Sequence, residues 1–303
     1  MKSSTLQIGS FTFAWGSRTY VMGILNVTPD SFSGDGILAK GDAAQQAVAQ
    51  AREFILHGAD ILDVGGESTR PGSAPVSVDE ELERVIPVIT ALRHNFPQVL
   101  LSVDTYKAQV AEEALRAGAD IINDVWGLRA DADLASVAAK YKAPVMLMHN
   151  RSNPASVEVR EKLGGTYLGA DYEDLLADVK RELLHSVALA AKAGVDETRI
   201  ILDPGIGFGK TREHNLELID RLAELRALGY PILLGPSRKS FIGFTLDLPP
   251  DQRIEGTAAT VAVGITRGAD IIRVHDIKEM VRVAKMTDAI VRHHQTPTTK
   301  DKP

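Results

Sequence analysis

The sequence predicts an α/β protein: a single-domain TIM (β/α)8 barrel with long loops after its first, second and fifth strands. Three observations predict it. Eight short apolar segments are each followed by a helical segment, the chain of 303 residues has the length of a barrel of about 250 residues with extensions, and one short phrase recurs where helices meet strands. Eight such units without a linker favour a closed barrel over an open doubly wound sheet.

The recurring phrase is "GADII", which begins at Gly118 and again at Gly268, with a near-copy, "GADIL", at Gly58. A glycine in this place is predicted to end a helix in the left-handed conformation, and the apolar residues after it enter a strand. Five residues past each glycine stands a different polar side chain: Asp63, Asn123 or Arg273. Because active sites of such barrels lie at the carboxyl ends of the strands, we expect each strand to deliver a different group to one shared mouth.

The eight predicted strands are near-continuous apolar runs, as expected where both faces of a parallel sheet are covered. They span about 21–25, 60–64, 99–103, 120–123, 144–148, 199–202, 231–234 and 270–274. Helical spacing follows each of them and is least defined after the seventh. The long loops cover about 26–41, 65–78 and 149–170, and loops of this length usually act as lids or binding loops.

The whole chain, 1–303, is assigned to one domain. The barrel is expected over about 20–293, between a short N-terminal extension at 1–19 and a flexible tail at 294–303.

The composition is that of a soluble globular protein, with 44% hydrophobic and 24% charged residues. A net charge of -6 without any basic run argues against a nucleic-acid partner. The absence of cysteine excludes disulfides and thiolate metal ligands, and no histidine pair has zinc-ligand spacing. The N-terminus lacks the apolar core of a signal peptide, and the longest small apolar run, "GTAATVAVGI", is too short to cross a membrane. We therefore expect a cytoplasmic protein with no membrane partner.

Polar side chains collect at the predicted strand ends. They are Asn26, Asp63, Asp104, Asn123, His149, Asp203, Ser237, Arg238, Lys239, Ser240, Arg273 and His275. A single strand-end aspartate often only caps a loop or pairs with an arginine, and Asp63 is the best candidate for such a structural role. His57 is most simply a helix-end residue. The convergence of cations, carboxylates and carboxamides at one rim is what indicates a functional site.

The segment "DPGIGFGKT" resembles a phosphate-binding loop but does not fit one. A Walker A motif needs a glycine five residues before Gly209, where this chain has Pro204. Lys210 occupies the place of the last glycine of a dinucleotide fingerprint. Both nucleotide-binding interpretations are therefore excluded.

Seven segments taken together resemble the signatures of the dihydropteroate synthases, in the same order. They are "GILNVTPDSFS", "DVGGESTRPG", "SVDTYK", "INDVWG", "LDPGIGFGK", "GPSRKSFIG" and "RVHD". The resemblance runs from about Val21 to Asp276. It implies a TIM barrel that joins 6-hydroxymethyl-7,8-dihydropterin diphosphate to p-aminobenzoate by an SN1-like displacement, releasing pyrophosphate, with Mg²⁺ as cofactor.

The resemblance also implies roles for individual residues. The pterin pocket would be lined by Asp104, Asn123, Met148, Asp203, Phe208, Gly235 and Lys239. The diphosphate would be held by Asn26, Arg70, Arg273 and His275, with Asn26 beside the magnesium ion. The p-aminobenzoate site would be bordered by Phe32, Thr69, Pro71 and Ser240. The residues with catalytic roles would be Asp104, Lys239, Arg273 and His275, and family members usually form homodimers through their later helices.

One sequence feature departs from the family pattern, and one general rule for barrels conflicts with the family assignment. The first lid commonly reads "DSFSDGG" in the family, whereas this chain has "DSFSGDG", which shifts the acid Asp35 by one place. In other barrels the loops after strands seven and eight commonly bind phosphate, which would assign "GPSRKS" to the diphosphate rather than to the pterin. Two other functions are compatible with the fold: a barrel that presents methyltetrahydrofolate to a cobalamin protein, and a catalytically silent ligand-binding barrel.

Overall fold

The computed structural model describes residues 3–27, 40–68, 73–153, 156–160 and 162–292. Eight parallel strands form one sheet in the order β10-β7-β6-β5-β4-β3-β12-β11. They are β3 (Tyr20–Asn26), β4 (Ile61–Gly65), β5 (Leu100–Asp104), β6 (Ile121–Asp124), β7 (Val145–Met148), β10 (Ile200–Asp203), β11 (Leu233–Leu234) and β12 (Ile271–Val274). A parallel bridge between Leu202 and Ile232 brings the two ends of this sheet together. The predicted TIM barrel is confirmed, and the eight strands lie where the sequence predicts them.

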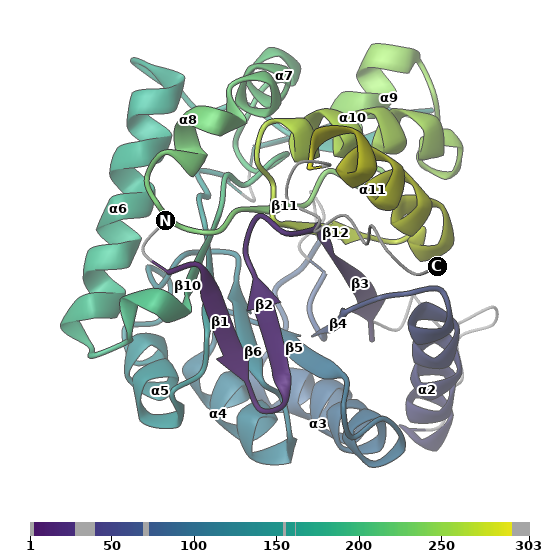
Figure 1. The fold of residues 1–303 in the computed structure, drawn as a ribbon, viewed down its shortest axis with the longest axis vertical. Helices are drawn as coiled ribbons and strands as arrows, with labels where there is room; N and C mark the ends of the chain where they lie inside the picture. The colour runs from purple at the N-terminus through teal and green to yellow at the C-terminus, as the bar shows by residue number, and fades with distance from the viewer. Residues whose placement is uncertain (1–2, 28–39, 69–72, 154–155, 161, 293–303) are drawn as a thin grey trace, which may run out of the picture.

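Helices surround the strands, as Figure 1 shows. They are α2 (Lys40–Leu56), α3 (Val78–Asn95), α4 (Ala108–Ala117), α5 (Leu134–Tyr141), α6 (Leu175–Lys192), α7 (Arg212–Asp220), α8 (Leu222–Arg226), α9 (Ser240–Leu246), α10 (Ile254–Thr266) and α11 (Ile277–Val291). The poorly defined helix after the seventh strand proves to be two, α9 and α10, separated by the short 3₁₀ turn η2 (Pro250–Gln252). Another 3₁₀ turn, η1 (Glu197–Arg199), leads into β10.

A layer of apolar side chains, called the floor below, fills the barrel interior toward the amino-terminal ends of the strands. Each of the eight strands contributes a buried side chain to it, namely Met22, Ile61, Leu100, Ile121, Met146, Ile201, Leu233 and Ile271, and β3 also contributes Tyr20. The N-terminal extension is not a loose arm, because it forms a hairpin of β1 (Thr5–Ile8) and β2 (Phe11–Ala14) that packs on this floor (Figure 1). Phe13 is fully buried and stacks on Trp15 with ring centroids 4.7 Å apart. The hairpin therefore closes the end of the barrel opposite the carboxyl ends of the strands.

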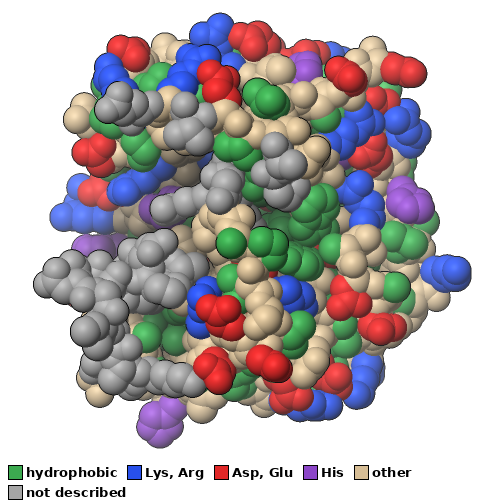
Figure 2. Space-filling model, turned by 180° about the vertical axis from the view of Figure 1, so that it is seen from behind, with side chains coloured by type: hydrophobic (Ala, Val, Ile, Leu, Met, Phe, Trp, Pro, Cys, Tyr) green, Lys and Arg blue, Asp and Glu red, His purple; other side chains and the backbone are tan. Residues whose placement is uncertain are grey.

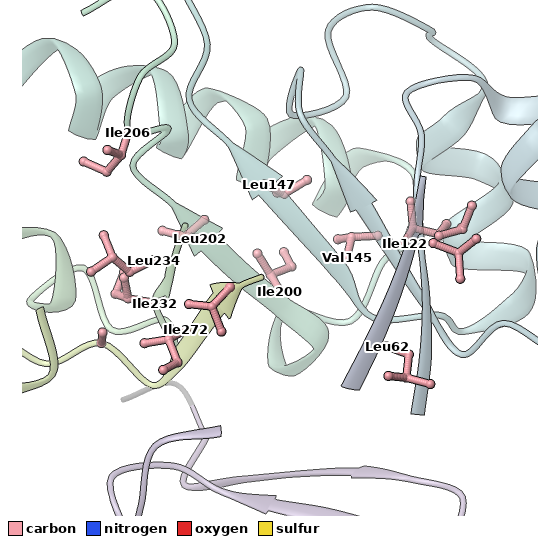
Figure 3. Packing of buried hydrophobic residues seen from close by; sticks show 14 of the residues in the cluster. Leu62, Ile122, Val145, Leu147, Ile200, Leu202, Ile206, Ile232, Leu234 and Ile272 are labelled. Carbon is pink, nitrogen blue, oxygen red and sulfur yellow. The ribbon is translucent and has the colours of Figure 1, made fainter. Parts of the chain in front are cut away.

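The side chains between the floor residues point the other way, toward the helices. Figure 3 shows this second layer, in which Leu62, Ile122 and Leu202 are labelled. Successive side chains of a strand lie on opposite faces, so an apolar strand in a barrel fills both the interior and the surrounding shell. This alternation explains why the strands read as unbroken apolar runs.

The repeated phrase forms the predicted joint. Gly58, Gly118 and Gly268 have φ of 100°, 114° and 102°, a region that favours glycine. The aspartate of each phrase has a structural function that the sequence analysis missed, since it accepts a backbone N–H from the neighbouring strand. Asp60 accepts from Val21 at 2.9 Å, Asp120 from Leu101 at 2.8 Å and Asp270 from Ile232 at 3.0 Å.

An arginine from another part of the chain pairs with each of these aspartates: Arg18, Arg93 and Arg226, respectively. The phrase is thus repeated because each copy fastens a new strand to its neighbour at the lower end of the barrel.

The long loop after the fifth barrel strand contains structure that the sequence did not predict. Strands β8 (Val157–Arg160) and β9 (Gly164–Tyr167) form an antiparallel hairpin there. The buried Arg253 donates to the carbonyl oxygen of Leu163 at 2.8 Å and to that of Arg238 at 2.9 Å. One side chain therefore fastens this hairpin to the loop that follows β11.

The surface seen in Figure 2 carries acidic and basic side chains intermixed rather than gathered by sign. Within the described part of the chain, no helix has the length and hydropathy needed to cross a bilayer. The assignment of all 303 residues to one domain stays a prediction.

The joint leads to a stability prediction. Replacing Asp120 with alanine removes a hydrogen bond from Leu101 N–H and an ion pair with Arg93, each to a charged carboxylate. We expect Asp120→Ala to lower the free energy of unfolding by about 2–4 kcal/mol, measured by urea denaturation. The matched control is Asp79→Ala, an exposed carboxylate in the first turn of α3, which should cost less than about 1 kcal/mol. Equal losses in the two variants would contradict the structural function of Asp120.

Candidate active site

The candidate site begins one step above the apolar floor. A step of two residues along a strand returns to the same face, so the residues two places after the floor residues also point into the barrel. They include Asp63, Ser102, Asn123, Met148, Asp203, Gly235 and Arg273. The interior thus changes from fully apolar to largely polar within one layer, at the carboxyl ends of the strands.

Asn26 and Asp104 lie one further step up, at the ends of β3 and β5. Gly65 of β4 is the register partner of both. A Cβ atom at Gly65 would lie 3.4 Å from the Cβ of Asp104 and 3.8 Å from Oδ1 of Asn26. The glycine therefore leaves room for the two polar side chains to lie close together at the mouth.

Arg273 lies between two carboxylates at the centre of the mouth. Its Nε donates to Oδ2 of Asp63 at 2.6 Å, and its Nη2 donates to Oδ2 of Asp104 at 2.5 Å. Asp63 is fully buried and also accepts from Nδ2 of Asn123 at 3.1 Å, which fixes the orientation of that amide. This geometry agrees with the structural role predicted for Asp63, which positions an arginine and a carboxamide.

Burial and ion pairing act against each other at Asp104 and Arg273. It raises the pKa of Asp104 to about 7, with Arg273 opposing the shift and Asp63 adding to it. For Arg273, burial alone would lower the pKa, but the two carboxylates outweigh it and the pKa is raised. The arginine therefore stays charged, and much of its charge is already neutralised before any anionic substrate arrives.

Asp203 and Lys239 form a second pair. Oδ1 of the buried Asp203 accepts from the backbone N–H of Gly205 at 2.7 Å. Lys239 donates to the carbonyl oxygen of Ile206, and its Nζ lies 4.6 Å from the centroid of the Phe208 ring. Burial raises the pKa of Asp203 and lowers that of Lys239 to about 8, and each charge partly offsets the shift of the other. A carboxylate and an ammonium thus face the same interior space.

An apolar wall borders this pair. Met148, Phe208, Val125 and Tyr167 form one buried cluster, and the rings of Tyr167 and Phe208 stack with centroids 6.1 Å apart. Tyr167 comes from β9, so the unpredicted hairpin supplies part of the wall. A flat aromatic ligand held by Asp203 and Lys239 would find apolar surface beside it.

Two serines complete the described rim. Oγ of Ser237 lies 2.9 Å from Nδ1 of His275 and accepts from the backbone N–H of His275 at 3.2 Å. Ser240 donates to Oγ1 of Thr166 at 3.1 Å. Arg238, another strand-end candidate, turns away to pair with Asp276. Its backbone has φ of 57°, and it joins β11 to α9 rather than lining the site.

The structure therefore brings together Asn26, Asp104, Asn123, Met148, Asp203, Phe208, Gly235, Lys239, Ser240, Arg273 and His275 at one end of the barrel. Phe32, Thr69, Arg70 and Pro71, together with Asp35, lie outside the described residues. Thr166 and Tyr167 were missed because their strand carries no apolar alternation. Ser102 was also missed, although its place two residues after the floor residue Leu100 could have indicated it.

A magnesium ion fits this mouth only with help from a substrate. Within the described ranges, no group of three or more histidine, aspartate or glutamate side chains has the geometry to hold a metal ion. The carboxamide oxygen of Asn26 is a suitable hard ligand, and Mg²⁺ is usually held by one or two protein ligands together with substrate phosphates. The donor set thus fits an ion that arrives with a diphosphate.

The sequence matches the family of pterin binding enzymes over residues 22–275. A curated relative, the dihydropteroate synthase of Clostridium beijerinckii, is 52% identical over 288 residues, which cover 95% of this chain and 100% of the relative. The dihydropteroate synthase of Bacillus subtilis is 52% identical over 281 residues, 91% of this chain and 92% of the relative.

Solved structures agree. The dihydropteroate synthase of Clostridium difficile, solved in the presence of pteroic acid, superimposes with a TM-score of 0.83 at 49% identity, covering 92% of this chain and 99% of that one. The Xanthomonas albilineans enzyme with 4-aminobenzoic acid gives a TM-score of 0.85 at 39% identity, covering 97% and 100%.

The family match covers almost the entire barrel and places the chain in the class of pterin-binding enzymes. Within that class the chain belongs to the dihydropteroate synthases, transferases of folate biosynthesis.

The pKa of Lys239 leads to a prediction about pH. Because burial lowers this pKa to about 8, Lys239 is an ammonium below pH 8 and a neutral amine above it. If the ammonium donates to a pterin, affinity should fall up to about tenfold for each pH unit above 8, as measured by calorimetry between pH 7.5 and 9.5. The titration of the free pterin is measured separately as the control. A constant affinity across this range would contradict a charged lysine in the site.

Proposed function

We propose that this chain joins 6-hydroxymethyl-7,8-dihydropterin diphosphate to p-aminobenzoate, giving 7,8-dihydropteroate and pyrophosphate. The observation that carries the proposal is the meeting of Asp203, Lys239 and Arg273 above the apolar floor, close enough to shift one another's pKa. The relatives add support, because one was solved in the presence of pteroic acid and another with 4-aminobenzoic acid, which correspond to the joined product skeleton and to one substrate.

The pterin would be recognised by its hydrogen-bonding edge. Its amino-pyrimidinone ring presents adjacent N–H donors, which a carboxylate such as Asp203 can accept in parallel. Lys239 is a donor only and suits the ring carbonyl and acceptor nitrogens, whereas Asn123 can both donate and accept. With Nδ2 of Asn123 held by Asp63, its oxygen is the atom left to accept from the ring. The wall formed by Met148 and Phe208 would cover the ring face.

The diphosphate would lie toward the rim, near Arg273, His275 and Asn26. Among the described residues, Arg273 uses Nε and Nη2 for its two carboxylates, which leaves Nη1 to donate to a phosphate oxygen. A diphosphate brings more negative charge than this neutralised arginine can balance. The site therefore calls for further positive charge, which Arg70, His275 and an ion at Asn26 would provide.

The reaction would proceed by loss of the leaving group before attack. The C–O bond at the pterin methylene breaks, both bonding electrons leave with pyrophosphate, and the electron-rich dihydropterin delocalises the remaining positive charge. The neutral arylamine then forms the new C–N bond and loses one proton to solvent or to the departing anion. Because an arylamine is already nucleophilic, Asp104 need not act as a strong base and serves to hold Arg273.

The p-aminobenzoate site is proposed at Ser240 with Phe32, Thr69 and Pro71. Ser240 is only part-buried and its hydroxyl can exchange Thr166 for a carboxylate oxygen. Magnesium would supply charge stabilisation for the leaving diphosphate.

A turnover assay tests the proposal. Purified protein with the pterin diphosphate, p-aminobenzoate and Mg²⁺ should release pyrophosphate in step with 7,8-dihydropteroate, and a sulfonamide should compete with p-aminobenzoate. Lys239→Ala should lose pterin binding while its circular dichroism spectrum stays that of the folded barrel. No turnover combined with tight binding of methyltetrahydrofolate would favour the methyl-transfer barrel instead, and no ligand binding at all would favour a silent barrel.

Metal removal gives a separate prediction. We expect EDTA to abolish turnover and added Mg²⁺ to restore it, because the described residues offer too few ligands to hold the ion tightly without substrate. Binding of 6-hydroxymethyl-7,8-dihydropterin, which lacks the diphosphate, should be the same with and without EDTA in a calorimeter. An ion that binds tightly to the protein alone would contradict this arrangement.

We also propose a homodimer and a cytoplasmic location. Val263 on α10 and Met286 and Ile290 on α11 are exposed, and these two helices pack on each other (Figure 1). Exposed apolar side chains on adjacent helices suit an interface between subunits.

A further inference from the structure

Lys210, the lysine of the "DPGIGFGKT" segment, is a buried group that the proposed chemistry does not use. Its side chain is 2% exposed and is among the largest buried side chains of the described residues. Its Nζ lies 2.9 Å from the carbonyl oxygen of Gly205, 3.0 Å from that of Phe208 and 3.0 Å from Nδ1 of His149. An ammonium has three N–H groups, and here each has one acceptor.

Burying an ammonium without a carboxylate in direct contact is costly, and burial lowers the pKa of Lys210 well below its usual value. An apolar side chain would fill the same space without that cost. The presence of a lysine at this position therefore calls for a function in holding the groups that it bonds.

Those groups belong to the turn of residues 203–210, which carries much of the proposed pterin site. Asp203 begins the turn, the carbonyl oxygen of Ile206 accepts from Lys239, and Phe208 lies in the apolar wall. The turn has little freedom: Gly205 has φ of 70°, and a Cβ there would lie 1.8 Å from the carbonyl oxygen of His149. Lys210 bonds the turn at two of its carbonyls and so sets where Phe208 and Ile206 lie.

His149 connects Lys210 to the helical shell. The imidazole is 1% exposed, and its Nε2 lies 3.0 Å from the carboxylate of Glu182 on α6. Glu182 is held in turn by Arg151, and its pKa is lowered to about 2 because bonds from His149 and Arg151 outweigh its burial. A neutral imidazole facing a carboxylate carries its proton on Nε2, which leaves Nδ1 as an acceptor. Lys210 must then be the donor in this contact.

We propose that Lys210, braced by His149 and Glu182, is a positioning residue that holds the 203–210 turn in its pterin-binding shape. The proposal rests on the proposed pterin site. The proposal predicts a selective effect of Lys210 on pterin affinity rather than a general effect on folding. On the p-aminobenzoate side, the hydrogen bond described for the Ser240 side chain goes to Thr166 and not to this turn.

The test compares Lys210→Met with Lys192→Met, a control at the exposed end of α6. Calorimetry with 6-hydroxymethyl-7,8-dihydropterin should show affinity falling about tenfold or more for Lys210→Met and unchanged for the control. In steady-state turnover, the KM for the pterin diphosphate should rise while the KM for p-aminobenzoate stays the same. Wild-type affinity in a folded Lys210→Met variant, or equal rises in both KM values, would overturn the proposal.

A second pair of variants decides the matter if Lys210→Met does not fold. His149→Leu removes the acceptor for Lys210 and should weaken pterin binding, whereas His149→Gln retains an acceptor and should restore most of the affinity. Equal affinities in the two variants would overturn the proposal. Nitrogen NMR of the wild-type imidazole should report a proton on Nε2 only, and a proton on Nδ1 would contradict donation by Lys210.

The test separates this proposal from the proposed function. Failure of the wild-type protein to bind the pterin would refute the function itself, whereas normal binding by wild type and Lys210→Met alike would refute only the positioning role.

Discussion

The structure depends on the alternation of side chains along eight parallel strands. Two residues along a strand return to the same face, so one register places the apolar floor and, directly above it, the polar layer of the site. The floor is closed below by the N-terminal hairpin, which keeps water from reaching the polar layer through the barrel. A shift of one residue in any strand would send its polar side chain into the helical shell.

Charge balance is the second constraint on the site. Arg273 is largely removed from solvent, so its charge depends on the two carboxylates, and each carboxylate is stabilised by the arginine. Burial pushes Asp104 toward the neutral form and Lys239 toward the amine, so it lowers the charge that each group carries in the mouth. A substrate that brings a diphosphate therefore has to bring or recruit positive charge, and this is the physical reason for expecting an ion that arrives with the substrate.

Buried polar side chains hold the residues that form the polar layer and the apolar wall of the site. Asp63 orients Asn123 and Arg273, Lys210 fastens the turn that carries Phe208, and Arg253 fastens the β8–β9 hairpin that carries Tyr167. Each of these supporting side chains is buried, and each hydrogen-bonds to a lining residue or to the segment that carries one. Positioning by buried polar side chains is effective because an unsatisfied partner in the interior is costly.

The sequence by itself determined the barrel, the eight strands, the glycine joints and most of the strand-end residues, because the pattern of apolar residues and left-handed glycines is local. It could not place the β8–β9 hairpin, because β9 reads "GGTY" without apolar alternation, or the hairpin under the floor. Nor could it assign the functions of Asp120 and Lys210, which depend on partners such as Arg93 and His149. Which charges meet, and which stay exposed, was decided only by the tertiary structure, since burial and distance between residues far apart in the chain set both pKa and pairing.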